Sequence, residues 1–89
     1  MFGTSTDWEF DDMDAAEAMA EKMWPTLKSA GALTFRSIKT GDNTVRSFIT
    51  WPDAATAQAS IDKMRAKALD QVRGKVVKAT AGELMTDYG

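Results

Sequence analysis

The segment from Ala32 to Trp51 constrains the fold more than any other part of this 89-residue chain. Two runs rich in β-branched and aromatic residues, 32–39 and 44–51, flank the sequence Thr-Gly-Asp-Asn at 40–43. This pattern is typical of a β-hairpin, in which a short glycine-containing turn joins two antiparallel strands. The sequence therefore predicts an antiparallel pair of strands in the middle of the chain.

The position of the turn decides which hairpin side chains share a face. A two-residue turn at Gly41-Asp42 places Arg36 opposite Ser47, with Phe35 opposite Phe48 and Ile38 opposite Val45. A turn at Asp42-Asn43 would oppose the like charges of Lys39 and Arg46, so we favour the first register.

In the favoured register, one face of the hairpin carries Arg36 together with Ser47, Ile49 and Trp51, and the other carries Phe35 and Phe48. Neither face is purely polar, which is unusual for a hairpin with one side in water. We therefore expect helices to cover one face and a second copy of the chain to cover the other.

Length and composition bound the class of protein. At 89 residues, 44% hydrophobic and 27% charged, residues 1–89 form one globular domain with a modest core, which dimerisation would extend. The net charge of −2 argues against a nucleic-acid partner. An acidic start with no long apolar run predicts neither a secretory signal nor a membrane span, so we expect a soluble, cytoplasmic protein.

The segments that flank the hairpin predict strands and helices. Residues 4–10 alternate as a strand, with Trp8 and Phe10 on one face. Asp14 and Glu17 form a capping box, which predicts a helix from Ala15 to the left-handed cap at Gly31. Pro25 lies inside this helix and predicts a kink or break near Trp24.

The second half of the chain predicts one further helix and one strand. Asp53 is the expected cap of a helix whose apolar stripe is Ala57, Ile61, Met64, Ala68 and Val72. Gly74 is its expected C-terminal cap, and residues 75–84 form the last strand. The order βαββαβ predicts an α+β, ferredoxin-like fold: a four-stranded antiparallel sheet with two helices on one face.

This order, with the sequence Trp51-Pro52-Asp53-Ala54-Ala55 at the end of the third strand, resembles the dimeric α+β barrel superfamily. Its members include antibiotic-biosynthesis-type monooxygenases. The resemblance implies a homodimer, the dimeric α+β barrel, with a small apolar pocket between sheet and helices in each subunit. In the cofactor-independent oxygenases of that superfamily, an Asn precedes the Trp by four residues and a Tyr follows it by six. Here those positions are Ser47 and Ala57.

Four residues are candidates for ligand binding: Arg36, Ser47, Trp51 and Trp24. Arg36 on an apolar face needs a partner, which is either a protein carboxylate or an anionic group of a ligand. Trp51 is either a core side chain or the wall of a pocket, and Trp24 beside Pro25 either lines that pocket or lies at a dimer rim. The expected ligand is a small apolar or aromatic molecule with an anionic group.

No metal or cofactor is expected. The chain has no His and no Cys, and the acids at 11, 12 and 14 are explained by the positive end of a helix dipole. Two functions stay open. The first is a small-molecule-binding homodimer resembling cofactor-independent monooxygenases or isomerases; the second is a non-catalytic dimerisation, ligand-carrier or regulatory module.

Overall fold

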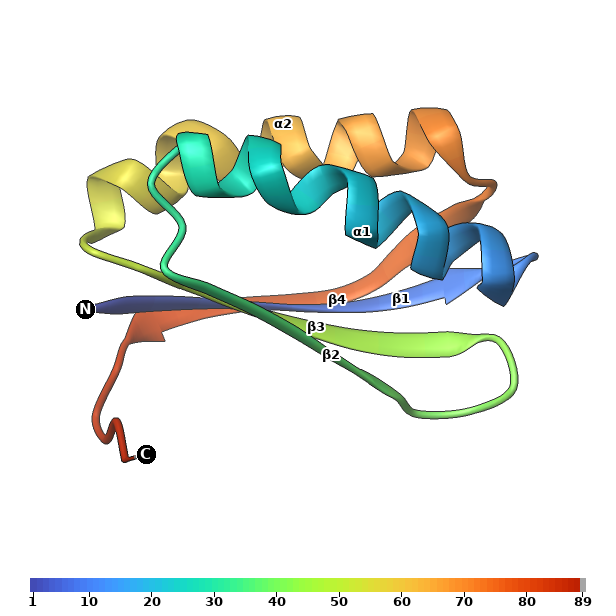
Figure 1. The fold of residues 1–89 in the computed structure, drawn as a ribbon. Helices are drawn as coiled ribbons and strands as arrows, with labels where there is room; N and C mark the ends of the chain where they lie inside the picture. Colours follow the sequence, from blue (N-terminus) through green and yellow to red (C-terminus); the bar gives the residue numbers. More distant parts are fainter. Residues whose placement is uncertain (89) are drawn as a thin grey trace.

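The computed structural model describes residues 1–88, which form one sheet and two helices (Figure 1). The elements are β1 (Phe2–Phe10), α1 (Met13–Ser29), β2 (Thr34–Lys39), β3 (Thr44–Trp51), α2 (Ala54–Gln71) and β4 (Gly74–Glu83). All strand pairs are antiparallel, and the strand order in the sheet is β2-β3-β1-β4. Both helices lie on the same side of the sheet (Figure 1). The expected ferredoxin-like βαββαβ fold is confirmed.

β1 occupies the centre of the sheet and alternates as its sequence predicts. Trp8 and Phe10 are buried under the helices, and their rings stack with centroids 5.3 Å apart. The pairing of β1 with the edge strand β4 shifts between Asp7 and Trp8, because Asp7 pairs with Lys78 whereas Trp8 pairs with Val76. Val77 is therefore an extra residue in β4, and its side chain is exposed.

α1 begins two residues earlier than the capping box predicted. Asp12, in an extended conformation, is the N-cap, and its carboxylate accepts a hydrogen bond of 3.1 Å from the backbone N–H of Ala15. The expected break at Pro25 does not occur, and α1 runs to Ser29. Pro25 has no backbone N–H to donate to the carbonyl oxygen of Glu21. Both residues are exposed, so water can hydrogen-bond to that oxygen instead. Gly31, with φ of 106°, follows the helix as predicted.

α2 begins at the cap that the sequence predicted. The Asp53 carboxylate accepts a 2.7 Å hydrogen bond from the backbone N–H of Thr56, and this bond lowers the pKa of Asp53. All members of the predicted apolar stripe are buried: Ala57, Ile61, Met64, Ala68 and Val72.

Gly74 does not cap α2 but begins β4, so its predicted role is wrong. A Cβ atom at this position would lie 2.4 Å from the carbonyl oxygen of Glu9 and 2.6 Å from the Phe10 ring. A side chain larger than hydrogen therefore has no room where β4 joins β1.

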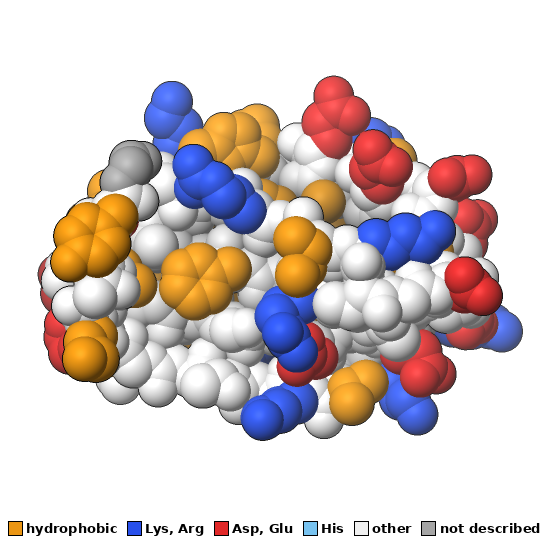
Figure 2. All heavy atoms as spheres, turned by 90° about the horizontal axis from the view of Figure 1, so that it is seen from below, with side chains coloured by type: hydrophobic (Ala, Val, Ile, Leu, Met, Phe, Trp, Pro, Cys, Tyr) orange, Lys and Arg blue, Asp and Glu red, His pale blue; other side chains and the backbone are white. Residues whose placement is uncertain are grey.

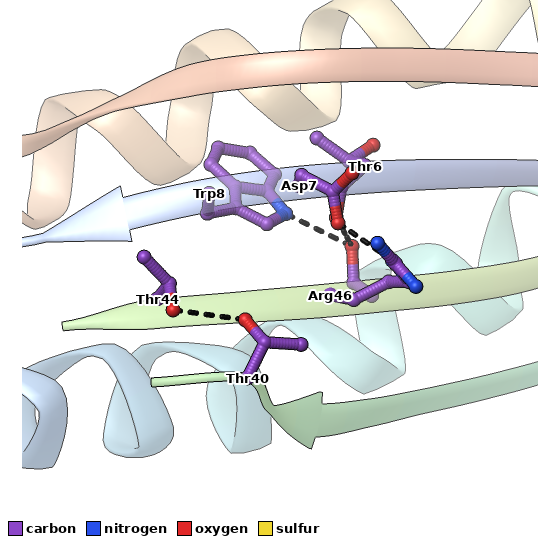
Figure 3. Close-up of polar contacts among 7 residues, drawn as sticks. Thr6, Asp7, Trp8, Thr40, Thr44 and Arg46 are labelled. Atoms are coloured by element: carbon purple, nitrogen blue, oxygen red, sulfur yellow. Dashed lines mark hydrogen bonds and ion pairs between the residues drawn. The ribbon is translucent and has the colours of Figure 1, made fainter. Parts of the chain in front are cut away.

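The hairpin differs from the prediction by one residue in register. Phe35 pairs with Ile49, and Arg36 pairs with Phe48. The loop has three residues, 41–43, closed by the backbone hydrogen bond of 3.0 Å from Thr40 to Thr44 and by a 2.9 Å bond between their hydroxyls (Figure 3). Both two-residue turns considered from the sequence are wrong, since the two threonines pair at the base of a longer loop.

This one-residue difference reverses the face on which every β2 side chain lies. Ser47, Ile49 and Trp51 of β3 are buried beneath the helices, as expected. Arg36, by contrast, pairs with the exposed Phe48 on the opposite face of the sheet. The expectation that Arg36 shares a face with Ser47 and Trp51 is therefore wrong.

We call the side of the sheet away from the helices the open face. Side chains on this face include Ser5, Asp7, Arg36, Ile38, Arg46, Phe48 and Thr80. Figure 2 shows the open face, on which separate hydrophobic side chains lie among Lys, Arg, Asp and Glu. Phe48 is 40% exposed and Ile38 is 59% exposed, so apolar surface remains uncovered in the single chain.

Candidate functional site

A cavity of about 350 Å³ lies between α1 and the β2–β3 hairpin, and we call it the α1 pocket. The α2 backbone approaches β1, β3 and β4 more closely than the α1 backbone approaches any strand, so space remains beneath α1. The pocket walls are mainly apolar. They are formed by the aromatic side chains of Trp8, Phe10 and Phe35, the thioethers of Met13, Met19, Met23 and Met64, and Ala16, Ala20, Val45 and Ala68.

Methionine dominates the wall contributed by the helices. Met13, Met19 and Met23 come from α1, and Met64 comes from α2. An unbranched thioether side chain with three rotatable bonds adapts its shape to what it contacts. The α1 pocket can therefore accommodate apolar molecules of more than one outline.

One wall of the pocket carries a buried polar pair. The indole N–H of Trp8 donates a 2.9 Å hydrogen bond to the hydroxyl of Ser47 on the neighbouring strand β3 (Figure 3). The Ser47 hydroxyl in turn lies 3.5 Å from the carbonyl oxygen of Thr6, which is a long contact for a donated bond. Ser47 is only 5% exposed and lines the pocket. Its proton can therefore be redirected to an acceptor oxygen inside the cavity.

Charged side chains lie at the outer edge of the same pocket. Lys39 extends from the end of β2, and Asp14 and Glu17 extend from the first turns of α1. All three are exposed. The pocket thus combines an apolar interior, one buried hydroxyl and a charged mouth.

Of the four predicted ligand-binding residues, the structure brings only Ser47 to the pocket lining. Trp51 is completely buried, and its indole N–H donates a 3.0 Å hydrogen bond to the hydroxyl of Thr4. Trp24 is partly buried behind the pocket wall, with its ring centroid 6.5 Å from that of Phe35. Arg36 lies on the open face, because it pairs with Phe48 and not with Ser47.

Sequence reasoning missed Trp8 and Lys39 as site residues. The alternation of β1 predicted that Trp8 shares a face with Phe10. Its nearness to Ser47 follows from the pairing of β1 with β3, which the sequence did not reveal. Lys39 lines the pocket because the register places it on the same face as Val45.

A second buried polar contact lies beneath α2. Arg65 donates hydrogen bonds of 3.2 and 3.1 Å from Nε and Nη2 to the hydroxyl of Thr6. The guanidinium also lies 3.5 Å from the exposed carboxylate of Asp62, one turn earlier. Arg65 therefore fixes the strand residue whose carbonyl faces Ser47.

The open face carries an ion pair of its own. Arg46 Nε lies 2.7 Å from a carboxylate oxygen of Asp7, and this hydrogen-bonded contact raises the pKa of Arg46 (Figure 3).

Among the described residues, no group of three or more acidic side chains is placed to hold a metal ion. No helix in residues 1–88 is long and apolar enough to cross a membrane.

Comparison with known proteins gives matches in structure but not in sequence. No family model and no curated protein matches the chain. Similar solved structures include a dimeric ferredoxin-like protein from an uncultured marine organism, with 14% identity and a TM-score of 0.67 over 99% of this chain and 98% of that one. This chain has the same ferredoxin-like fold.

Two further similar solved structures carry named activities. One is a variant of SnoaB, a cofactor-independent oxygenase from Streptomyces nogalater, with 6% identity and a TM-score of 0.67 over 97% of this chain and 94% of that one. The other is an antibiotic biosynthesis monooxygenase, with 11% identity and a TM-score of 0.61 over 97% of this chain and 100% of that one. At these identities the likeness shows the shared fold.

Proposed function

We propose that this protein is a homodimer that binds a small apolar or aromatic molecule in the α1 pocket of each subunit. The observation that carries the proposal is the cavity itself. Its volume of about 350 Å³ lies within the range of small-molecule sites, and its walls combine aromatic and thioether groups with one buried hydroxyl, that of Ser47.

The polar groups define how such a molecule would lie. An acceptor oxygen at its inner end would accept a hydrogen bond from the Ser47 hydroxyl. The Trp8 indole N–H, which donates to the same hydroxyl oxygen, holds Ser47 in place. An anionic group would point outward to Lys39 on the β2 side of the mouth, away from the carboxylates of Asp14 and Glu17 on the α1 side. Lys39 thus takes the role that the sequence suggested for Arg36. Trp24 stacks on Phe35 of the lining, and Trp51 lies outside the lining.

Two activities fit such a site. The first is cofactor-independent oxidation or isomerisation of an activated carbon acid, which the shared fold with SnoaB supports. The protein would position the substrate and stabilise a developing oxyanion through Ser47. The second is ligand carriage or regulation without catalysis. It is supported by the Ser47 hydroxyl itself, whose hydrogen bonds run to an indole and a backbone carbonyl and not to a general base.

The proposed dimer is supported by the open face and by a relative. Phe48 and Ile38 leave apolar surface exposed on the side of the sheet that no helix covers. The marine ferredoxin-like protein of the same fold is itself dimeric. Packing two open faces together would bury this surface in both copies.

Two matched variants of α1 test the pocket. Ala20 lines the cavity, whereas Ala18 lies on the exposed side of the same helix. We expect Ala20→Phe to fill the cavity and to weaken binding of 2-naphthoate, measured by calorimetry, by about tenfold or more. Ala18→Phe should leave the affinity unchanged. Circular dichroism confirms that both variants fold.

Native mass spectrometry of protein purified from its own host measures the dimer mass and any retained molecule together. We expect a dimer with bound ligand for the wild type and for Ala18→Phe, and an empty dimer for Ala20→Phe. Equal naphthoate affinities for the two variants would contradict the pocket assignment.

A further inference from the structure

The last described residues form an exposed apolar and acidic segment, 84–88, which we call the tail segment. It leaves the end of β4 and turns away from the helices, to the side of the open face (Figure 1). Met85 is 96% exposed and Tyr88 is 92% exposed, so neither side chain packs on its own chain. Asp87 supplies the negative charge of this segment, whereas the Glu83 carboxylate at the end of β4 already lies 3.7 Å from the Met1 amino group.

Arg36 on β2 and Lys78 on β4 are cations of the open face that have no carboxylate partner among residues 1–88. Within residues 1–88, Arg46 pairs with Asp7 and Lys75 lies 3.9 Å from Glu9, but Arg36 takes part in no ion pair. Arg36 is exposed on the edge strand β2, beside Phe48. This position suits a carboxylate supplied from outside the subunit.

A hollow of about 290 Å³ lies on the open face next to the start of the tail segment. Gly3 and Gly82 pair with each other there and present no side chains, while Phe48 and Leu84 border the hollow. Unfilled space beside exposed apolar groups indicates a surface that is completed by another molecule.

The strand order shows which edge of a second copy would lie over β2 and Arg36. β2 and β4 are the two opposite edges of the sheet. When two open faces pack about a two-fold axis that runs along the strands, the β4 edge of each copy lies over the β2 edge of the other. The acidic end of one chain then meets the basic edge of the second, and by symmetry the contact occurs twice.

We propose that each tail segment crosses onto β2 of the second copy, where Asp87 pairs with Arg36 of that copy and Met85 and Tyr88 cover its apolar surface. The inference rests on the homodimer of the proposed function and adds the contact that fixes its orientation. It also gives the exposed Arg36 an anionic partner in the dimer.

Mixing two charge-reversed variants tests the contact. Arg36→Asp and Asp87→Arg each create two like-charge contacts in their own homodimers, whereas the mixed dimer regains two opposite-charge contacts. Statistical mixing gives equal amounts of mixed dimer and of the two homodimers combined. We expect native mass spectrometry, after subunit exchange, to show the mixed dimer in excess by about threefold or more.

Lys78→Asp is the matched control, because Lys78 is exposed on the same sheet but lies on β4. Mixed with Asp87→Arg, it makes the same change in net charge, and we expect a clearly smaller excess of mixed dimer. An equal excess would show that net charge alone drives pairing and would overturn the proposed contact.

The two proposals fail in different ways. A wild-type protein that is monomeric at micromolar concentration contradicts the homodimer itself. If the wild type is dimeric but the mixture of Arg36→Asp and Asp87→Arg stays at the statistical ratio, only the tail contact is contradicted. Folding of the tail back onto its own sheet would also contradict only the tail contact.

Discussion

Three buried hydroxyl groups on the helix side of the sheet accept hydrogen bonds from polar side-chain groups in or beside the apolar core. Thr4, Thr6 and Ser47 each accept a hydrogen bond from a side chain that would otherwise bury an unpaired N–H: Trp51, Arg65 and Trp8, respectively. No buried side-chain nitrogen or oxygen in the described part of the chain is left without a partner. The cost of burying two indoles here is therefore offset residue by residue.

Thr4→Val tests this arrangement at its most buried point. The substitution keeps the shape of the side chain but leaves the indole N–H of Trp51 buried without an acceptor. We expect it to lower the free energy of unfolding by about 1–3 kcal/mol. Urea denaturation at a fixed protein concentration measures the change. Thr26→Val, at an exposed position of α1, is the control and should have little effect; equal losses would contradict the role of Thr4.

At single positions, the sequence predicted orientation within a strand better than pairing between strands. Ser47 and Trp51 lie on the face that alternation indicated, since alternation depends only on neighbouring residues. The side on which Arg36 lies depends on the length of a loop, and a loop one residue longer moved it to the opposite face. Trp8 and Ser47 are 39 residues apart, so no local pattern could predict their hydrogen bond.

The elements themselves were predictable because their signals are local. The cap at Asp53, the buried stripe of α2 and the left-handed glycine at position 31 depend on residues within a few positions of each other. Element ends were harder to predict. Asp12 and Asp14 both have the chemistry of an N-cap, and the end of β1 at Phe10 decides between them.

Gly74→Ala tests the junction at which β4 joins β1. Gly74 has no positive φ, so backbone strain is not the reason for a glycine here. An added methyl group would instead meet the Glu9 carbonyl oxygen and the Phe10 ring. We expect a loss of stability of about 1–3 kcal/mol, measured as a change in the urea midpoint.

Gly82→Ala is the matched control on the same strand, because a Cβ atom there has no neighbour within 4 Å among the described residues. At a protein concentration low enough to keep the chain monomeric, it should leave stability nearly unchanged. If both variants lost the same stability, the loss would come from the strand preference of the residue and not from the close approach of β1.

For the molecule as a whole, one face of the sheet is covered by helices and the other is not. Packing of two open faces would remove Phe48 from water in each copy. We expect Phe48→Glu to shift the protein to monomer, measured by light scattering during gel filtration, since the charge would be buried between two apolar surfaces. Leu69→Glu, an equal change on the exposed part of α2, should leave the mass unchanged. A Phe48→Glu protein that remained dimeric would place the interface elsewhere.

The extra residue at Val77 has a consequence for how far assembly can proceed. β4 presents one edge of its sheet without a neighbouring strand, and such an edge can recruit further chains into a growing ribbon. The irregularity at Val77 interrupts the even spacing of backbone donors and acceptors along that edge. A further chain would find no continuous ladder to extend along β4, so we expect this edge to resist strand addition.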